Sequence, residues 1–528
     1  MASDTFDHIV IGSGSAGGVV AARLAEDPQV RVLLLEAGPA DDDEMIKMPV
    51  GFSALFRTKY DWNYRTSGQK QLEGRRKTWP RMKALGGCSS LNAMIYIRAA
   101  AADYDEWRDA YGADGWGYDD VLPYFKRSEG NQRLSDQFHN TQGPLHVEDR
   151  VFTHELSEAW VESAVAAGMK RTDDFNGASQ EGAGIYQVTC KKGRRWSVAD
   201  AFIRPAMERP NFTVRTDAFV TRILVDGGRA TGVAYQSGGE EHVVRAEGEI
   251  ILSGGAINSP QLLMLSGIGP GAHLREHGIE VLVDSPGVGQ NLQDHPVGGP
   301  LYYTHKTYDL AGELGLKNLM RWKATGKGPL ASNVGEAGGY FKSHDDLADP
   351  DIQVFVAPTG FYDNGEHEPT RAAVTVAACL VRVESKGQIR LRSADPTWHP
   401  EIDPAYFDDQ TDLDAIVRGI RRIVDINREK PFDDYIAAPW VPETRDPSDA
   451  QIEAAVRRMA QTLYHPVGTC AMGTVEGSVV GPDLKVHGID GLRVADASVM
   501  PRVPRGNTNA PTIMIGEKAA DLIKQEPT

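Results

Sequence analysis

Six residues near the start of the chain, Gly12-Ser13-Gly14-Ser15-Ala16-Gly17, have the spacing of a phosphate-binding turn. In such a turn Gly12 permits the tight bend, Gly14 lets the backbone approach a pyrophosphate, and Gly17 lets a helix pack on a strand. The following helix offers free N–H groups and its positive dipole end to phosphates. Glu36 lies where a carboxylate binds ribose hydroxyls. These residues predict a dinucleotide site and do not separate FAD from NAD.

Hydrophobic patterns predict the elements that position this turn. Phe6–Ile11 and Val30–Leu35 are short apolar runs typical of buried strands, and the segment between them has helical spacing through Val19, Ala22 and Leu24. A strand, a glycine-rich turn, a helix and a second strand form a βαβ unit. We therefore expect a parallel, Rossmann-like sheet at the start of the chain.

Later segments predict a sheet of a different kind. Apolar residues alternate in Ile352–Val356, Ala373–Leu380 and Ile389–Leu391, as in antiparallel strands, and Leu413–Asn427 has helical spacing. The predicted fold class is α/β, or α+β overall, with a Rossmann-like domain and a second domain built on an antiparallel sheet with helices. A length of 528 residues also favours more than one domain.

Composition narrows the classes of function. The net charge of −17 repels a phosphate backbone, so nucleic acid is not an expected partner. No apolar run reaches the roughly 20 residues of a membrane span, and no basic segment precedes an apolar core at the N-terminus, so we expect a cytoplasmic protein. The four cysteines are far apart and form no CxxC pair, which argues against a zinc site or disulfide framework. No metal is expected.

Four longer motifs resemble those of the glucose–methanol–choline (GMC) oxidoreductases. Ala84–Asn92 (ALGGCSSLN) is similar to the family's first signature and Gly255–Gly269 (GAINSPQLLMLSGIG) to its second. Arg493–Ser498 and Asn507–Thr512 resemble its C-terminal motifs. The resemblance covers nearly the whole chain and is strongest to the bacterial choline dehydrogenase and alcohol dehydrogenase branch.

The resemblance implies the domains and the cofactor. It implies an FAD-binding domain of residues 1–154, 197–300 and 463–528, and a substrate domain of residues 155–196 and 301–462. It also implies that FAD is held non-covalently, because Leu91 stands where some relatives have the histidine that bonds the flavin. Besides the opening turn and Glu36, the implied FAD contacts are Ala37, Gly86, Gly87, Ser90, Asn92, Ala93, Met94, Val220, Gly255, Asp496, Ala497, Asn507 and Asn509.

The resemblance also implies a reacting pair. Alcohol oxidation requires removal of the hydroxyl proton and transfer of a hydride from carbon to flavin N5. His465 matches the family's catalytic histidine, and an imidazole can take that proton near neutral pH. Asn509 matches the second member of the pair, whose amide would hold the developing alkoxide. Asn507, two residues earlier, is the weaker candidate.

The substrate and the electron acceptor are poorly marked. The implied reaction is FAD-dependent oxidation of a primary alcohol to the aldehyde, with electrons passed to O₂, a quinone or another acceptor. Glu336, Trp62 and Tyr464 are candidates for binding a quaternary ammonium such as choline. Glu336 also suits an ion pair or a strand edge, which leaves a neutral alcohol open. The alternatives are a lyase of the same family that keeps FAD without net redox change, and an NAD-binding or catalytically silent protein.

Overall fold

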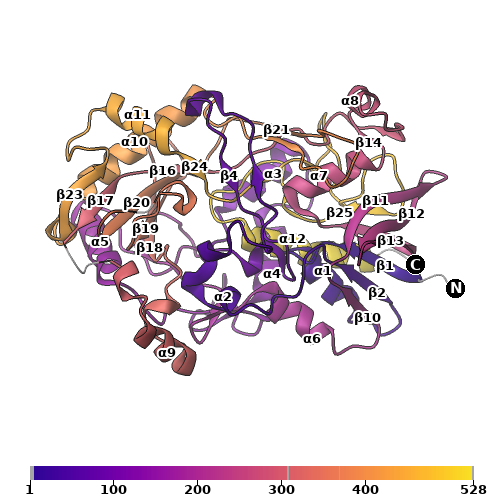
Figure 1. The fold of residues 1–528 in the computed structure, drawn as a ribbon, viewed down its shortest axis with the longest axis horizontal. Coiled ribbons are helices and arrows are strands. Elements are labelled where there is room, and N and C mark those ends of the chain that lie inside the picture. Colours follow the sequence, from indigo (N-terminus) through magenta and orange to yellow (C-terminus); the bar gives the residue numbers. More distant parts are fainter. Residues whose placement is uncertain (1–4, 306–308, 368, 526–528) are drawn as a thin grey trace.

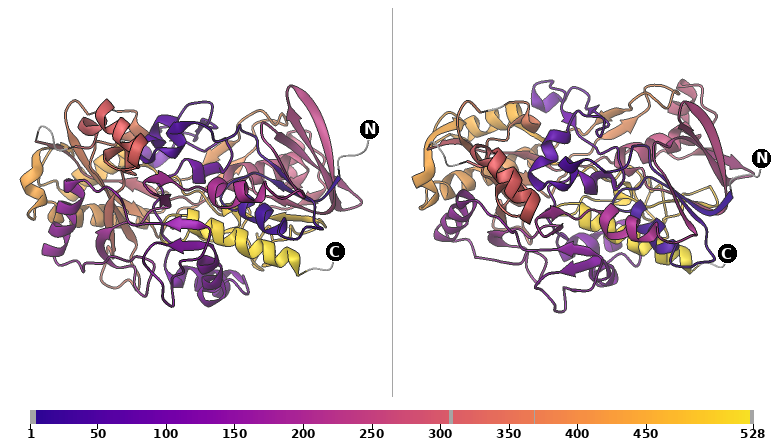
Figure 2. Two further views of the ribbon diagram at one scale, coloured as in Figure 1. Left: turned by 90° about the horizontal axis from the view of Figure 1, so that it is seen from below. Right: turned by 60° about the horizontal axis from the view of Figure 1, so that its bottom comes forward.

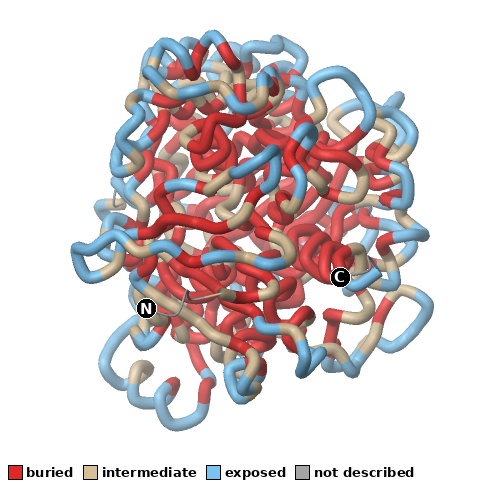
Figure 3. The backbone as a smooth tube through the Cα atoms, turned by 90° about the vertical axis from the view of Figure 1, so that its right-hand side faces the viewer, coloured by how far each residue is buried: buried red, intermediate tan, exposed pale blue. Residues whose placement is uncertain are grey.

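The computed structural model describes residues 5–305, 309–367 and 369–525. Two sheets lie towards opposite ends of the long axis, and helix α12 (Asn509–Lys524) runs from the middle of the molecule towards the first of them (Figure 1). The buried backbone is continuous through the interior and the exposed backbone forms the outer loops (Figure 3). The region between the two sheets is where the predicted cofactor motifs meet.

The first sheet contains the predicted βαβ unit. Its strands run in the order β10-β2-β1-β13-β12-β11, and β25 lies beside β13. The pairs β10–β2, β2–β1, β1–β13 and β13–β25 are all parallel. Helix α1 (Gly17–Leu24) connects β1 to β2 as predicted. The strand bounds are β1 Thr5–Ile11, β2 Val32–Leu35, β10 Phe212–Arg215, β11 Phe219–Asp226, β12 Arg229–Ser237, β13 Glu240–Leu252 and β25 Leu492–Val494.

Close packing fixes helix α1 against its neighbours. A methyl group placed on Gly17 would lie 2.0 Å from the Gly12 carbonyl oxygen, and one on Gly516 of α12 would lie 2.7 Å from the Ala16 carbonyl oxygen. Only glycine permits both approaches. Helix α12 therefore rests directly on the glycine-rich turn and brings the segment just before it to the same place, while its other side packs against α4 (Tyr118–Ser128) (Figure 2).

The second sheet is antiparallel, as predicted. Its order is β23-β17-β20-β19-β18-β7, with β16 beside β20 and β24. The predicted strands are β19 and β20, and the predicted helix is α10 (Gln410–Ile426), which packs on β20. The bounds are β7 Gly182–Ile185, β16 Pro296–Gly298, β17 Leu301–Thr304, β18 Ala337–Phe341, β19 Ile352–Ala357, β20 Ala373–Leu380, β23 Ile436–Val441 and β24 Gln461–Thr462.

Two details differ from the sequence-based expectation. The segment predicted as the strand Ile389–Leu391 is β21 (Gln388–Arg390), which forms a separate ribbon with β22 (Glu401–Asp403). Strand β16 belongs to the second sheet, although the predicted division at residue 300 assigns it to the FAD-binding part. The boundary between the two sheets therefore falls a few residues earlier than that division.

Shorter elements cover the two sheets. Helix α5 (Glu155–Ala166) packs against β7 and β18, and α7 (Gly255–Leu265) packs against β11.

In the described chain no helix combines the length and the apolar character needed to cross a membrane. The remaining helices are α2 Glu44–Lys47, α3 Ala101–Tyr111, α6 Arg204–Ala206, α8 Gly271–Glu276, α9 Leu316–Thr325 and α11 Asp449–Met459; the short strands are β3 Tyr64–Arg65, β4 Thr78–Trp79, β5 Glu129–Asn131, β6 Leu145–Val147, β8 Cys190–Lys191, β9 Arg194–Arg195, β14 Ile268–Gly269 and β15 Val283–Asp284.

Candidate active site

A cavity of about 370 Å³ connects the glycine-rich turn to His465. Residues from all the quoted motifs line it, although they are spread over almost 500 positions of the sequence. The predicted residues that line it are Gly12, Gly14, Ser15, Ala16, Glu36, Ala37, Gly87, Asn92, Ala93, Met94, Val220, Gly255, Asp496, Ala497, Asn507 and Asn509, together with His465, Tyr464 and Trp62.

Bare backbone faces one part of this cavity. Gly12 has φ +97°, and a methyl group on it would lie 2.4 Å from the Ser253 carbonyl oxygen. A methyl group on Gly255 would meet no atom within 4 Å, and one on Gly14 would meet only the Gly87 Cα, at 4.0 Å. Gly14 and Gly255 thus leave open space that side chains would fill, next to the start of α1. This shape suits the pyrophosphate of a dinucleotide.

Two carboxylates stand at the ends of parallel strands in the same wall. Glu36, after β2, accepts hydrogen bonds from the Ser13 hydroxyl (2.6 Å) and the Gly38 N–H (2.9 Å). Burial raises the pKa of Glu36, although those hydrogen bonds act to lower it. Asp496, after β25, accepts from the N–H groups of Gly255 and Ser498, both at 2.8 Å. Asp496 therefore caps a short helical turn and also joins the last motif to the second signature.

Three predicted cofactor residues shape the turns and do not line the cavity of the described chain: Gly17, Gly86 and Ser90. The buried Ser90 hydroxyl donates to the Leu85 carbonyl oxygen (2.9 Å), which closes its own turn. The Gly86 N–H donates to the Ser13 hydroxyl (3.1 Å), which joins the two glycine-rich turns. These three residues thus have a structural role in the turns, and their contact with FAD stays a prediction.

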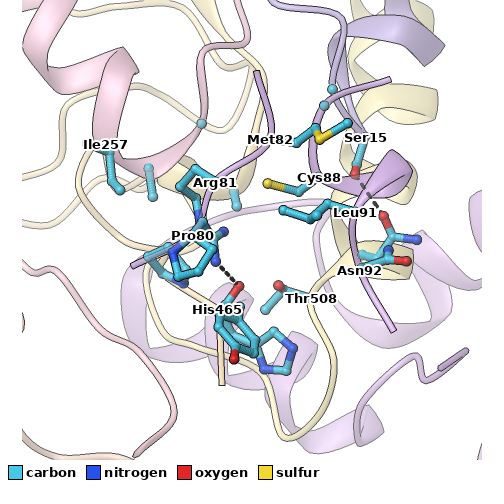
Figure 4. Close-up of a pocket in the computed structure, with 18 of the residues that line it drawn as sticks. Ser15, Pro80, Arg81, Met82, Cys88, Leu91, Asn92, Ile257, His465 and Thr508 are labelled. Carbon is cyan, nitrogen blue, oxygen red and sulfur yellow. Dashed lines mark hydrogen bonds between the residues drawn. The ribbon is translucent and has the colours of Figure 1, made fainter. Parts of the chain in front are cut away.

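The backbone at His465 is held from two sides. Tyr464 has φ +68°, a left-handed conformation that is uncommon for a residue with a side chain. The Arg81 guanidinium donates to the Tyr464 carbonyl oxygen (2.5 Å), and the His465 N–H donates to the Asp294 carboxylate (2.8 Å). These bonds fix the direction in which the imidazole leaves the chain. Figure 4 shows His465 with Arg81, Leu91, Asn92 and Thr508 around the cavity.

The two ring nitrogens of His465 have different neighbours. Its Nδ1 lies 3.0 Å from Nδ1 of the fully buried His295, and its Nε2 lies 3.4 Å from the amide nitrogen of Asn507. Gln353 donates to the Asn507 amide oxygen (3.1 Å), so the NH₂ group of Asn507 faces the imidazole. An amide N–H needs an unprotonated Nε2 as acceptor. The proton of neutral His465 therefore lies on Nδ1, towards His295, and the lone pair of Nε2 faces the Asn507 amide.

The structure differs from the predicted His465–Asn509 pair. The Ser15 hydroxyl donates to the Asn509 side-chain oxygen (2.7 Å), so Asn509 joins the first turn of α12 to the glycine-rich turn. Asn507, two residues before the helix begins, is the asparagine beside His465. The start of α12 separates the two side chains, which a linear motif does not reveal.

Burial keeps this histidine pair neutral. Desolvation, followed by the proximity of His295 and Arg81, lowers the pKa of His465 well below its usual range, and burial lowers the pKa of His295 to about 3.

The low pKa of His465 predicts the pH dependence of the reaction. Since protonated His465 cannot act as a base, kcat/KM for an alcohol should stay on a plateau as the pH falls through 6.5 and decline only at lower pH. A kcat/KM profile from pH 4.5 to 9 tests this; a decline centred at pH 6.5 or above would contradict it.

Glu336 is not a substrate residue in this structure. Its carboxylate is fully buried, lies 3.0 Å from the Arg150 guanidinium, and accepts from the Ser157 hydroxyl (2.8 Å) and the Ser332 hydroxyl (2.5 Å). It is not among the residues lining the cavity in the described part of the chain. The expectation that Glu336 attracts a quaternary ammonium is therefore wrong, because Arg150 already neutralises its charge.

The two predicted aromatic residues do line the cavity, in different surroundings. Trp62 stacks with Tyr64 (5.9 Å between ring centroids) and lies 6.0 Å from Phe219, beside Val220. Tyr464 packs against Phe56 (5.8 Å), and its hydroxyl donates to the Asn364 side-chain oxygen (2.6 Å). Trp62 thus lies beside Val220, one of the implied FAD contacts, and Tyr464 lies beside His465, the predicted catalytic histidine. They do not form one aromatic cage.

The wall near Tyr464 is largely apolar. Its side chains come from the segment that follows β2, from the second sheet and its loops, and from the segment before His465. They are Phe52, Phe56, Val297, Phe355, Phe361 and Leu463. Asp363 also lines the cavity, but its carboxylate is paired with the ammonium group of the buried Lys77. This end of the cavity therefore offers apolar contact, a few polar groups and the Arg81 guanidinium, while the Asp363 carboxylate is neutralised by Lys77.

The residues that position His465 were not predicted from the sequence. His295 carried one signal, because His295-Pro296 repeats the dipeptide His465-Pro466. Arg81, Asp294 and Gln353 carried none, since each is joined to the site by a contact across the fold.

Comparison with known proteins agrees with this geometry. Family models described as GMC oxidoreductase match residues 6–297 and 383–516. The chain is 42% identical to alcohol dehydrogenase [acceptor] of Pseudomonas putida, over 98% of this chain and 95% of that protein. It is 41% identical to oxygen-dependent choline dehydrogenase of Sinorhizobium fredii, with the same coverage. The crystal structure of pyridoxine 4-oxidase from Mesorbium loti superposes with a TM-score of 0.91, at 30% identity over 99% of this chain and 100% of that one.

The chain therefore belongs to the GMC oxidoreductase family, whose members bind FAD. It is an enzyme, an oxidoreductase acting on CH–OH donors.

Proposed function

We propose that this enzyme oxidises a neutral, largely apolar primary alcohol to the aldehyde, with His465 as acid/base and Asn507 as its hydrogen-bonding partner. The observation that carries the proposal is the unprotonated Nε2 of His465, which lies beside the Asn507 amide in the cofactor cavity. A base and a hydrogen-bond donor at one point are what the removal of a hydroxyl proton requires.

The residues divide the chemistry as follows. Bound FAD supplies the hydride acceptor, N5 of its flavin ring. His465 Nε2 takes the hydroxyl proton, and the Asn507 NH₂ group donates to the alcohol oxygen as negative charge develops there. His295 accepts the Nδ1–H of His465 and so holds the imidazole with its unprotonated Nε2 towards the cavity. The alcohol thus loses one proton to the protein and one hydride to the cofactor, which balances its oxidation to an aldehyde.

The cofactor contacts support non-covalent attachment. Leu91 lines the cavity and offers no nucleophile to the flavin, whereas the cradle of Gly12, Gly14 and Gly255 has the shape needed to bind the pyrophosphate. We therefore propose that FAD is retained by hydrogen bonds and packing along the cavity. The carboxylates of Glu36 and Asp496 are in position to accept hydrogen bonds from FAD hydroxyls.

The lining of the cavity supports a neutral substrate over choline. Both carboxylates that would favour a cation, Glu336 and Asp363, are neutralised by Arg150 and Lys77. The relatives include both an alcohol dehydrogenase and a choline dehydrogenase, so similarity alone favours neither substrate. The apolar wall of Phe56, Phe355 and Leu463 suits the hydrocarbon part of an alcohol.

One substrate panel tests the proposal. The holoenzyme is mixed without O₂ with aliphatic, benzylic and furanic alcohols, sugars and choline, and bleaching of the flavin absorbance is followed. We expect apolar primary alcohols to bleach it with a second-order rate constant for flavin reduction at least about tenfold above that of choline. The reason is that a bound quaternary ammonium would leave a desolvated charge unpaired. Parallel assays of peroxide and of an artificial dye then assign the acceptor.

Two results would contradict the proposal. Preference for choline would overturn the assignment of a neutral substrate. Failure of every alcohol to bleach the flavin, together with release of cyanide from a cyanohydrin, would support the lyase alternative.

A further inference from the structure

Helix α9 presents apolar side chains on its outer face. Leu316 is 74% exposed and Met320 is 62% exposed, and they stand four residues apart, on one side of the helix. The opposite side carries the fully buried Trp322 and also Leu319, which packs against the core. Exposed apolar residues on a soluble protein need no explanation when they are scattered singly, whereas a cluster of them marks an interaction surface.

Basic side chains surround this apolar ridge. Residues 314–327 contain four exposed basic residues and no aspartate or glutamate: Lys317, Arg321, Lys323 and Lys327. The β8–β9 hairpin adds the exposed Lys191 and Lys192, and its Arg194 donates to the Lys323 carbonyl oxygen (3.0 Å). Acids near this surface include Glu44, which pairs with Lys323 (2.7 Å), Glu313, and the buried Glu148, which accepts from the Lys192 N–H (2.8 Å). The surface is therefore cationic on a chain whose net charge is −17.

We propose that this surface, residues 314–327 with Lys191 and Lys192 and named here the α9 patch, docks the enzyme on an anionic phospholipid membrane. Leu316 and Met320 would enter the boundary between headgroups and acyl chains, while the lysines and Arg321 contact lipid phosphates. Since an anionic membrane repels the rest of this acidic chain, the α9 patch also determines the orientation of the bound enzyme.

The position of α9 favours this partner. The helix projects at the lower edge of the molecule in Figure 1, where a flat surface can reach it. Beside its start lies a surface depression of about 430 Å³ whose lining includes Lys317, Arg321, Glu313 and Phe152. The two cations outnumber the one carboxylate, which leaves a net positive charge for a phospholipid headgroup, and the aromatic ring suits the apolar chains beneath it.

Docking through α9 also brings the lipid close to the apolar end of the cavity. Trp322 and Leu319 of α9 pack with Met48 and Val50, at the start of the 3₁₀ helix Pro49–Leu55. That 3₁₀ helix carries Phe52, which lines the cavity. The docking proposal does not depend on the identity of the alcohol.

Cosedimentation of the purified holoenzyme with vesicles tests the proposal. We expect binding to vesicles made of equal parts phosphatidylglycerol and phosphatidylcholine, and at least about tenfold weaker partitioning into pure phosphatidylcholine or at high salt. The double variants Leu316→Gln/Met320→Gln and Lys317→Glu/Arg321→Glu should each reduce the partition coefficient at least about tenfold. Dye-linked turnover without vesicles should stay unchanged, because these residues line no part of the catalytic cavity of the described chain.

A matched control separates the α9 patch from exposed apolar residues in general. Val243 is 50% exposed and Leu282 is 45% exposed, and both lie far from α9 in the sequence. The variant Val243→Gln/Leu282→Gln should bind vesicles as the wild type does. Absence of wild-type binding, or equal binding by Leu316→Gln/Met320→Gln, would overturn the proposal. So would a wild-type dimer that this α9 variant converts to a monomer, because a second copy of the chain would then cover the face.

Discussion

Replacing His465 with alanine should slow anaerobic bleaching of the flavin by the preferred alcohol by about 10² to 10⁴-fold, the usual contribution of a general base. The imidazole is the group whose free nitrogen, Nε2, faces Asn507 in the cavity, and its removal leaves the alcohol proton without an acceptor. Stopped-flow absorbance measures the rate constant, and the ratio of flavin to protein absorbance shows that FAD is still bound.

The His465 experiment has an internal control. His487 is an exposed histidine outside the cavity of the described chain, and His487→Ala should reduce the flavin at the wild-type rate. If His465→Ala also retained the wild-type rate, His465 would not be the base. If His465→Ala lost FAD, its bleaching rate could not be compared with that of the wild type. His465→Gln, which keeps a hydrogen-bonding side chain of similar length, then replaces it. This variant should bind FAD and still reduce the flavin slowly.

Two asparagines in one turn should respond differently to the same change. Asn507→Ala should lower the rate of flavin reduction by about 10² to 10³-fold, the typical cost of one donor to a developing oxyanion. Asn509→Ala should leave that rate within about threefold of the wild type, because the Asn509 oxygen accepts from Ser15 and not from the reacting pair. Its effect should appear as weaker FAD binding, since the glycine-rich turn loses a contact with α12.

The comparison uses two measurements on each variant. Stopped-flow bleaching reports the reaction, and titration of the apoprotein with FAD reports the dissociation constant of the cofactor. The opposite pattern, with Asn509→Ala slow and Asn507→Ala nearly unaffected, would restore the pair expected from the motif. Changes of equal size in both variants would assign both asparagines to one structural role.

Local requirements explain what could be predicted from the sequence. The turn after β1 needs a residue at φ +97°, which glycine adopts without strain, so Gly12 identifies it by type and position. The all-buried strand β2 and the strand β20 follow from short apolar patterns that depend on burial alone. The family resemblance then pointed to His465, and most of the FAD contacts that it implied line the cavity.

The errors came from contacts that neighbouring residues do not encode. Asn507 and Asn509 differ by two positions, and the start of α12 decides which of them faces His465. Glu336 has the residue type of a cation-binding group, but Arg150, from a distant part of the chain, neutralises it.

The sequence by itself therefore determined the class of this protein, an FAD-binding oxidoreductase, and pointed to His465 as the proposed base. Only the tertiary structure decided how that histidine is used. His295 is 170 positions away along the chain, and the pairing of β16 with β24 brings it next to His465. Because His295 faces Nδ1 and the Asn507 amide faces Nε2, the proton lies on Nδ1, so contacts across the fold set the protonation of the proposed base.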